Sequence, residues 1–447
     1  MTLDSIERCR NVNVSQQPDS SSDPRRQFAL EIVRRLRQEG FQALWAGGCV
    51  RDQLLNLTPK DYDVATDAIP EQVRRMFGRR RTLAIGQAFG VIVVLGPKSA
   101  GQVEVATFRQ DAAYSDGRHP DHVTFSSAPE DAQRRDFTIN GLFYDPLAER
   151  VIDYVGGQQD LQRRLIRAIG DPAHRFAEDK LRMLRAVRFA TVFDFQIEAG
   201  TLAAIRRSAD ELTVVSAERI AAELRRILSH ARRRTGMQLL DQCRLLTKIF
   251  PELQPAVQAP PNDPLAIAWH QTLTILDRLE EPSPATAMAA VLRSLADDRE
   301  GGLQTIHRVC RRLRLSNEEI AEIDFLVRHE SMVRTARQQP WPRLQRLLIQ
   351  PLSGPLLDYA RAVAEVVDGT TDNVRFCREK RALPHQQWNP PPLITGQDLH
   401  AIGLPPGPIY RLILERVRDA QLENRIATRD QALELARQFR SSQSTKE

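Results

Sequence analysis

The spacing of hydrophobic residues divides the chain into a mixed N-terminal part and a helical remainder. From about residue 27 to 150, helical periods alternate with short strand-like runs. We expect helices at 27–38, 49–56 and 69–78, and strands at 42–46, 60–66, 91–96 and 102–108. A Gly/Pro/Ser turn separates the last two strands, which predicts a hairpin. The pattern indicates a small α+β domain with a mainly antiparallel or mixed sheet.

Beyond Asp153 almost every apolar pattern is helical, with clear helices at 176–193, 216–229 and 235–250. The linkers are proline-rich, at 258–264 and 388–392. The predicted organisation is a disordered tail (1–24), an α+β head (25–150), a helical neck (151–257), a helical body (258–388), a helical tail (389–440) and a disordered end (441–447).

Composition narrows the class of protein. The 447 residues are 42% hydrophobic and 27% charged, without an apolar run of membrane-spanning length or a secretory signal, so we expect a cytoplasmic protein. The five cysteines are scattered without a C-x-x-C pair, which disfavours disulfides and structural zinc. A net charge of +6 suits an anionic partner such as nucleic acid, but an arginine bias from a GC-rich genome explains it equally well.

Two features near the N-terminus favour a nucleotide. Gly47 and Gly48 stand between a strand and a helix, where backbone N–H groups can approach a phosphate; an ordinary tight turn is the alternative. Asp61 and Asp63 share one face of the next strand and repel each other unless a cation or a proton intervenes. Mg²⁺ bound by two carboxylates and substrate phosphates would resolve this, with Glu104 as a possible third ligand. The alternative for these carboxylates is a solvated strand.

These motifs, GGCVRD, DYDVAT and RRDFTINGLFYDP (134–146), resemble the class II tRNA nucleotidyltransferase and poly(A) polymerase family. The similarity continues through 153–190 and 216–228, so it covers roughly residues 27–230. The resemblance implies that Asp61 and Asp63 bind the catalytic Mg²⁺. It implies triphosphate contacts for Gly47, Gly48 and Arg51, and ribose or phosphate contacts for Arg134, Arg135, Asp136 and Asn140. Gly141 departs from the alanine more usual in the family.

A second constellation lies in the predicted helix 176–193. Asp179 and Arg182 are three residues apart, away from the apolar stripe of that helix, and could present acceptors and donors to a base. An ordinary surface ion pair is the alternative. The resemblance implies that this pair selects CTP and then ATP, with support from Glu178, Arg185 and Arg188.

Within the family, the chain most resembles a bacterial CCA-adding enzyme. Gln87 and Ala88 stand where bacterial poly(A) polymerases carry two basic residues. The long segment 108–137, with Asp111, Asp116 and Arg118, resembles the flexible loop of enzymes that add CCA or only A, whereas CC-adding members have a shortened loop. We therefore expect CCA addition to the tRNA 3′ end from CTP and ATP. A-adding, CC-adding and poly(A) activities, and an inactive RNA-binding protein, are the alternatives.

The C-terminal half is less informative. Residues 264–335 faintly resemble an HD phosphohydrolase domain, with His270 and His329 at ligand positions. Arg293-Ser294 replaces the central His-Asp pair, so we expect no hydrolase activity. Residues 391–436 resemble the tail of bacterial members, which implies contact with the acceptor and TΨC arms of tRNA; neither DNA nor a membrane is an expected partner.

Overall fold

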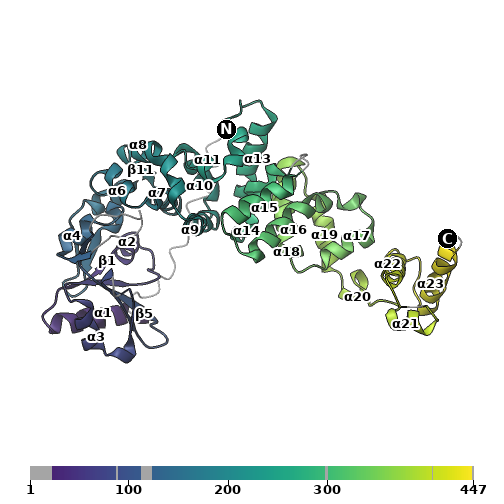
Figure 1. Cartoon of the computed structure of the whole chain (residues 1–447), viewed down its shortest axis with the longest axis horizontal. Coiled ribbons are helices and arrows are strands. Elements are labelled where there is room, and N and C mark those ends of the chain that lie inside the picture. Colours follow the sequence, from purple (N-terminus) through teal and green to yellow (C-terminus); the bar gives the residue numbers. More distant parts are fainter. Residues whose placement is uncertain (1–22, 87–88, 112–122, 297–300, 405, 445–447) are drawn as a thin grey trace, which may run out of the picture. The chain divides into compact units, whose positions relative to one another are not determined.

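The computed structural model describes residues 23–86, 89–111, 123–296, 301–404 and 406–444 (Figure 1). The chain forms two compact units: residues 1–219 with 239–249, and residues 220–238 with 250–447. The predicted N-terminal tail lies outside the described residues, apart from its last two, and the domain boundaries proposed from the sequence stay a prediction. No helix among the described residues has the length and apolarity to cross a membrane.

A seven-stranded mixed sheet organises the first unit, in the order β3-β4-β5-β2-β1-β8-β9. The strands are β1 Ala43–Ala46, β2 Asp63–Thr66, β3 Thr82–Gly86, β4 Val91–Leu95, β5 Gln102–Thr107, β8 Leu142–Asp145 and β9 Arg150–Asp153. Every pairing in this sheet is antiparallel except that of β2 with β5. The predicted mixed sheet and the β4–β5 hairpin are therefore confirmed. Strand β2 begins at Asp63, so Asp61 precedes it and does not lie within it.

Short helices cover one face of this sheet at the purple end of the chain (Figure 1). They are α1 Pro24–Gln38 and α3 Pro70–Phe77, while α2 Gly48–Leu54 follows β1 directly. The Asp23 side chain accepts from the Arg25 N–H and caps α1, whose apolar stripe, Phe28, Ile32 and Leu36, is buried. These helices cover one side of the sheet, and Ala128 and Ala132 pack on the other side against Leu44, Ala65 and Phe143.

The described parts of the segment 108–137 contain regular secondary structure, although a loop was predicted. It contains a hairpin of β6 Arg109–Asp111 and β7 Val123–Phe125, followed by α4 Ala128–Gln133. Ser127 and Glu130 form a capping box that starts α4, a signal that the sequence carries. Asp111 ends β6, whereas Asp116 and Arg118 lie outside the described residues.

The predicted helix 176–193 is wrong in one decisive place. The structure has α6 Pro172–Glu178 and α7 Leu181–Phe193, and Asp179 between them is extended, with φ −145° and ψ 103°. An Asp179 carboxylate oxygen accepts from the Leu181 N–H at 3.0 Å, so the side chain offers the backbone an alternative to a continuous helix. The predicted helix 235–250 is also divided, into α10 Arg233–Gln242 and α11 Leu246–Ile249. Between them the backbone of Arg244 is in the left-handed region (φ 61°).

The remaining described residues are mostly helical. In the first unit they include α5 Gly157–Arg163 and α8 Ala199–Ser208, with a two-residue parallel pair, β10 Leu165–Ile166 and β11 Gln196–Ile197. Helix α9 Ala217–Leu228 crosses from the first unit into the second. The second unit contains α12 Gln254–Gln258, α13 Pro264–Arg278, α14 Pro284–Leu292, α15 Gly302–Arg312, α16 Asn317–Arg334, α17 Trp341–Leu348, α18 Ser353–Val367, α19 Asp372–Ala382, α20 His385–Trp388, α21 Gly396–Ala401, α22 Ile409–Leu422 and α23 Arg429–Ser444. Helix α23 continues to Ser444, past the predicted limit of 440.

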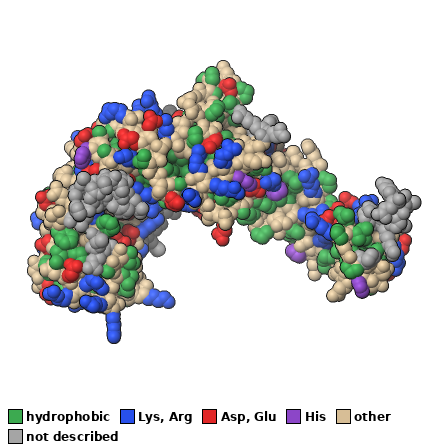
Figure 2. Space-filling model, in the orientation of Figure 1, with side chains coloured by type: hydrophobic (Ala, Val, Ile, Leu, Met, Phe, Trp, Pro, Cys, Tyr) green, Lys and Arg blue, Asp and Glu red, His purple; other side chains and the backbone are tan. Residues whose placement is uncertain are grey.

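On the face seen in Figure 2, basic and acidic side chains are interspersed over both units.

An arginine occupies the place of the missing HD pair. The buried Arg293 guanidinium lies 3.2 Å from Glu330, which also meets Arg334 at 3.3 Å. Arg334 in turn pairs with Asp368 at 2.6 Å, and these carboxylates raise its pKa. His270 is exposed and His329 half-buried. The second unit therefore has a buried ion pair at this position, between the Arg293 guanidinium and the Glu330 carboxylate.

We predict that Glu330→Gln destabilises the protein by about 3 kcal/mol, because it leaves the Arg293 charge buried without its carboxylate. The exposed pair of Arg375 and Asp372 supplies the control, Asp372→Asn, which should cost less than about 1 kcal/mol. Urea unfolding followed by circular dichroism measures both. Equal midpoints for the two variants would contradict a buried, energetically important pair.

Candidate active site

A cavity of about 650 Å³ in the first unit collects most of the residues singled out in the sequence. Its lining is Gly47, Gly48, Arg51, Asp61, Asp63, Arg134, Arg135, Asp136, Asn140, Asp179, Leu181, Arg182, Arg185, Arg188, Phe189 and Arg219. Of the candidates whose side chains the structure describes, Glu104 and Glu178 are absent from this lining. Leu181, Phe189 and Arg219 are additions that sequence reasoning missed. The volume is within the range of small-molecule sites.

The glycine turn allows an arginine to approach the backbone. Gly47 has φ 72°, and a Cβ atom there would lie 2.7 Å from Nη1 of Arg135. The same Nη1 donates to the carbonyl of Asn140 at 3.2 Å. Any side chain at position 47 would therefore be strained and would displace a guanidinium from the cavity.

The carboxylates form an electrostatically unfavourable group. Asp63 on β2 pairs in register with Glu104 on β5, so their side chains share a face of the sheet. Burial, together with the nearby charges of Glu104 and Asp61, raises the pKa of Asp63 to about 7 against the opposing effect of Arg135. No group of three or more His, Cys, Asp or Glu side chains in the described part of the chain has the arrangement of a metal site. Two oxygen-donating carboxylates that lack a compensating charge nevertheless fit a hard divalent cation that takes its other ligands from phosphate and water.

A hydrogen-bonded chain preorganises the far wall of the cavity. Arg51 donates to the Asn140 side-chain oxygen at 2.6 Å, and the Asn140 amide donates to Asp136 at 3.0 Å. Arg185 pairs with the other oxygen of Asp136 at 2.6 Å. Burial favours a raised pKa for Asp136, but Arg185 and Asn140 outweigh it and lower the pKa to about 2. Asp136 is therefore a fixed anion, and the Arg51 guanidinium is further held 4.5 Å from the centre of the Phe193 ring.

Asp131 is a second supporting residue that the sequence analysis missed. Its buried carboxylate pairs with Arg134 at 2.8 Å and with Arg135 at 2.9 Å. Burial works to raise its pKa, but the two guanidinium groups outweigh that effect and lower it. The spacing i, i+3 and i, i+4 from Asp131 on helix α4 was the available signal. One carboxylate thus orients both arginines.

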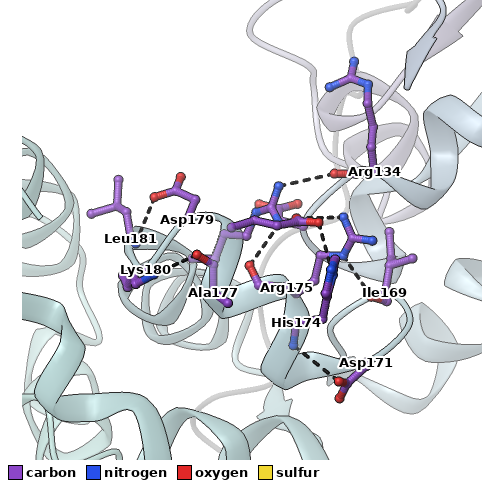
Figure 3. A network of polar contacts seen from close by, with 12 residues as sticks. Arg134, Ile169, Asp171, His174, Arg175, Ala177, Asp179, Lys180 and Leu181 are labelled. Atoms are coloured by element: carbon purple, nitrogen blue, oxygen red, sulfur yellow. Dashed lines mark hydrogen bonds and ion pairs between the residues drawn. The ribbon is translucent and has the colours of Figure 1, made fainter. Parts of the chain in front are cut away.

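The break between α6 and α7 contains Asp179 (Figure 3), and Arg182 is the second residue of α7. Glu178 accepts from Arg175 at 2.9 Å and pairs closely with Arg182, whose Nη2 donates to the Arg134 carbonyl at 3.3 Å. Asp179 gives one oxygen to the Leu181 N–H and the other to Arg219 at 2.8 Å. The prediction that Asp179 and Arg182 share one helix face is wrong, because Asp179 lies between α6 and α7, but both side chains line the same cavity.

Arg185 and Arg188, predicted only as supporting residues, line the cavity directly. The Arg188 guanidinium lies 3.9 Å from the centre of the Phe189 ring. Together with Arg51, Arg134, Arg135, Arg182 and Arg219, they make the wall opposite the carboxylates strongly basic. Such a wall suits a polyanionic ligand such as a triphosphate.

We predict that Asp63→Asn stabilises the metal-free protein at high pH. A carboxyl pKa raised from 3.8 to about 7 favours the protonated form in the fold, so its contribution is fully present below pH 4 and is lost as pH rises through 7. In EDTA at pH 8, Asp63→Asn should raise the free energy of unfolding by up to about 4 kcal/mol, and less at pH 5. Urea titrations at both values measure the difference; no dependence on pH would contradict it.

Comparisons with known proteins agree with this site. Residues 43–167 match the family model of the poly A polymerase head domain, and residues 194–257 match the probable RNA and SrmB-binding site of polymerase A. The chain is 44% identical over 210 residues to a CCA-adding enzyme of Enterococcus faecalis, covering 47% of this chain and 50% of the relative. It is 41% identical over 222 residues to that of Bacillus subtilis, covering 49% and 55%. The match thus spans about half the length of these curated relatives.

Solved structures resemble the chain over a greater length. The Bacillus stearothermophilus CCA-adding enzyme in complex with CTP has a TM-score of 0.70 and 25% identity, covering 94% of this chain and 99% of the other. A Thermotoga maritima CCA-adding enzyme complexed with tRNA has a TM-score of 0.64 at 18% identity, covering 92% and 94%, and supports the fold alone. Residues 43–167 and 194–257 are thus similar to two families of poly A polymerase domains, and the fold of the chain resembles that of solved CCA-adding enzymes.

Proposed function

We propose that this protein is a template-independent RNA nucleotidyltransferase that adds CCA to the 3′ end of tRNA, using CTP and ATP and releasing pyrophosphate. The observation that carries the proposal is the convergence of three groups in one cavity. They are the Asp61–Asp63 pair, the basic wall and the Asp179–Arg182 pair. The similar proteins named CCA-adding enzymes, including solved complexes with CTP and with ATP, support the same reading.

The carboxylates would carry the chemical step. In our proposal Asp61 and Asp63 hold Mg²⁺, with Glu104 as a possible third ligand. When bound, the cation activates the RNA 3′-hydroxyl and neutralises charge on the leaving pyrophosphate. The basic wall orients the triphosphate so that its α-phosphorus faces the hydroxyl: Arg51 and Arg135 lie beside the glycine turn, and the closeness of Arg135 to Gly47 fixes that position.

The sugar and the base would be recognised by separate groups. Asp136 and Asn140 have the acceptors and donors that pair with a 2′-hydroxyl, which favours ribonucleotides. Arg182, oriented by Glu178, can donate to a ring nitrogen or carbonyl, and Asp179 can accept from the exocyclic amine of C or A. Protein side chains would then replace a nucleic-acid template.

The remaining elements of the proposal concern the partner and its setting. Residues 391–436 would contact the acceptor and TΨC arms of tRNA, largely through phosphates. The helices there enclose a core of their own, which includes Leu399, Ile413 and Ala432. We propose a cytoplasmic location, where tRNA precursors and nucleotides meet.

We predict that the purified protein extends a tRNA lacking CCA by exactly two C and one A when given CTP and ATP. To test this, tRNAs that end before, within and just short of CCA are each incubated with the protein and a single labelled nucleotide, and the products are separated on sequencing gels. CC-only, A-only and poly(A) products each identify one of the alternative activities.

Asp61→Ala and Asp63→Ala should lower kcat by about 10³-fold or more for every nucleotide. If the wild type and both variants were equally inactive, the inactive RNA-binding alternative would stand.

We also predict a role for Arg219 in nucleotide choice, because its guanidinium holds Asp179 at 2.8 Å. Arg219→Gln should reduce discrimination of CTP against UTP about tenfold, as Asp179→Asn and Arg182→Gln should, since each removes one charged hydrogen bond from the base site. Arg207→Gln, at an exposed arginine of α8, is the matched control. Competition assays give the ratios of kcat/KM. Unchanged ratios for Arg219→Gln would mean that Asp179 needs no such support.

A further inference from the structure

The two side chains assigned to the ribose, Asp136 and Asn140, stand at the ends of a short segment that contains a single 3₁₀ turn, Thr138–Asn140. The Asn140 amide donates to Asp136 at 3.0 Å, so the two side chains form one joint set of donors and acceptors. An isolated 3₁₀ turn has poor hydrogen-bond geometry and little stability of its own. The position of Asn140 therefore depends on what holds the turn.

Backbone pairing holds the first part of this segment. The Thr138 N–H donates to the Arg167 carbonyl at 3.0 Å, and the Ile169 N–H donates to the Asp136 carbonyl at 3.2 Å. Residues 136–138 thus run antiparallel to residues 167–169. Asn140 lies beyond this pairing, at the far end of the turn.

Helix α5 packs directly against the turn. The Asp153 carboxylate accepts from the backbone N–H groups of residues 155–158 and fixes the start of this helix. At Gly157, the first residue of α5, a Cβ atom would lie 2.2 Å from the carbonyl oxygen of Thr138, so the helix can approach this closely only with glycine there. Asp160 follows three residues later, in the same helix.

A buried hydrogen bond joins the helix to the turn. The Thr138 hydroxyl donates to the Asp160 carboxylate at 2.7 Å, and the two residues are 2% and 3% exposed. The same carboxylate oxygen accepts from Nε of Arg167 at 3.1 Å, and Nη1 of Arg167 lies 3.4 Å from Glu198. Hydrogen bonds to a charged acceptor are stronger than those between neutral groups. Asp160 therefore fixes the side chain at the start of the turn.

A buried threonine with a satisfied hydroxyl is ordinarily a structural residue. Thr191 on α7 is an example: it is fully buried, and its hydroxyl donates to the Val187 carbonyl at 2.8 Å. Thr138 differs from it in location, because Asp136 and Asn140 lie two residues away on either side. A displaced turn would move Asn140 relative to Asp136, and small displacements of a binding group are costly to recognition.

We propose that the Thr138–Asp160 pair positions Asn140 for the 2′-hydroxyl of the incoming nucleotide and so favours ribonucleotides over deoxyribonucleotides. This inference rests on the proposed function, which assigns Asp136 and Asn140 to the sugar. Neither Thr138 nor Asp160 lines the cavity, so both are positioning residues that act through the turn. A deoxynucleotide lacks the hydroxyl and gains nothing from a correctly placed amide.

Binding of CTP and of 2′-deoxy-CTP to the full-length protein tests the pair without requiring catalysis. Calorimetry with Mg²⁺ and without RNA measures both affinities. We expect the wild type to prefer CTP, and Thr138→Val to weaken CTP binding about fivefold to tenfold while leaving 2′-deoxy-CTP binding unchanged. Thr138→Ser retains the hydroxyl and should restore the preference. Asp160→Leu should reproduce the loss, and adding Thr138→Val to it should cause no further loss.

Thr191→Val is the matched control, because it removes an equally buried hydroxyl from the same unit. Both valine variants should lower the midpoint of urea unfolding, but only Thr138→Val should change the ratio of the two affinities. Equal losses for CTP and 2′-deoxy-CTP, or an unchanged ratio, would overturn the proposal, because the role of Thr138 would then be structural only.

The wild type separates this inference from the proposed function. If it bound both nucleotides equally, or neither, the positioning role would be overturned even if the protein added CCA to tRNA. A selective loss of CTP binding in Thr138→Val, on a protein that transfers no nucleotide to tRNA, would support the pair while refuting the proposed function.

Discussion

The site depends on the repulsion between carboxylates that the fold forces together. Strand pairing fixes Glu104 beside Asp63, and Asp61 lies two residues before the first residue of the same strand. Burial and these neighbours raise the pKa of Asp63 to about 7, so the group is poorly satisfied without a cation or a proton. The rest of the cavity is arranged around this deficit of positive charge. Most of the arginines that line the cavity are engaged by carboxylates other than Asp61 and Asp63, which leaves this pair open to a cation and a phosphate.

Preorganisation of the arginines is the second theme of the structure. Asp131 holds Arg134 and Arg135, Asp136 holds Arg185, and Glu178 holds Arg182. Seven cationic side chains in one cavity would repel one another and move freely without such partners. With them, the basic wall has a defined shape before any ligand binds, which is the condition for orienting a reactive phosphate. Different parts of the chain supply different groups to the cavity. The sheet and the residues just before it supply the carboxylates, and the helical segment after residue 170 supplies groups suited to hydrogen bonds with a base.

Much of this could be predicted from the sequence, and the failures have physical causes. Strand alternation and the glycine turn identified the sheet and the carboxylate pair because these signals are local. The family resemblance named most of the cavity lining. The α6–α7 break was missed because the buried Phe176 keeps a helical spacing to Leu184 and Val187 across Asp179, whereas a single side-chain hydrogen bond to the Leu181 N–H accompanies the end of the helix. Arg219 was missed because its partner is 40 residues away and no local pattern signals the pair.

The most direct test of the account is divalent-cation binding at the carboxylates. Calorimetric titration of the nucleotide-free protein with Mg²⁺ and with Mn²⁺ at pH 7, in buffers of different ionisation enthalpy, reports both binding and proton release. The account predicts binding to the wild type with release of a fraction of a proton, and loss of that binding in Asp63→Asn. Equal cation binding by the wild type and by Asp63→Asn would contradict the assignment of Asp61 and Asp63 as the metal-binding pair.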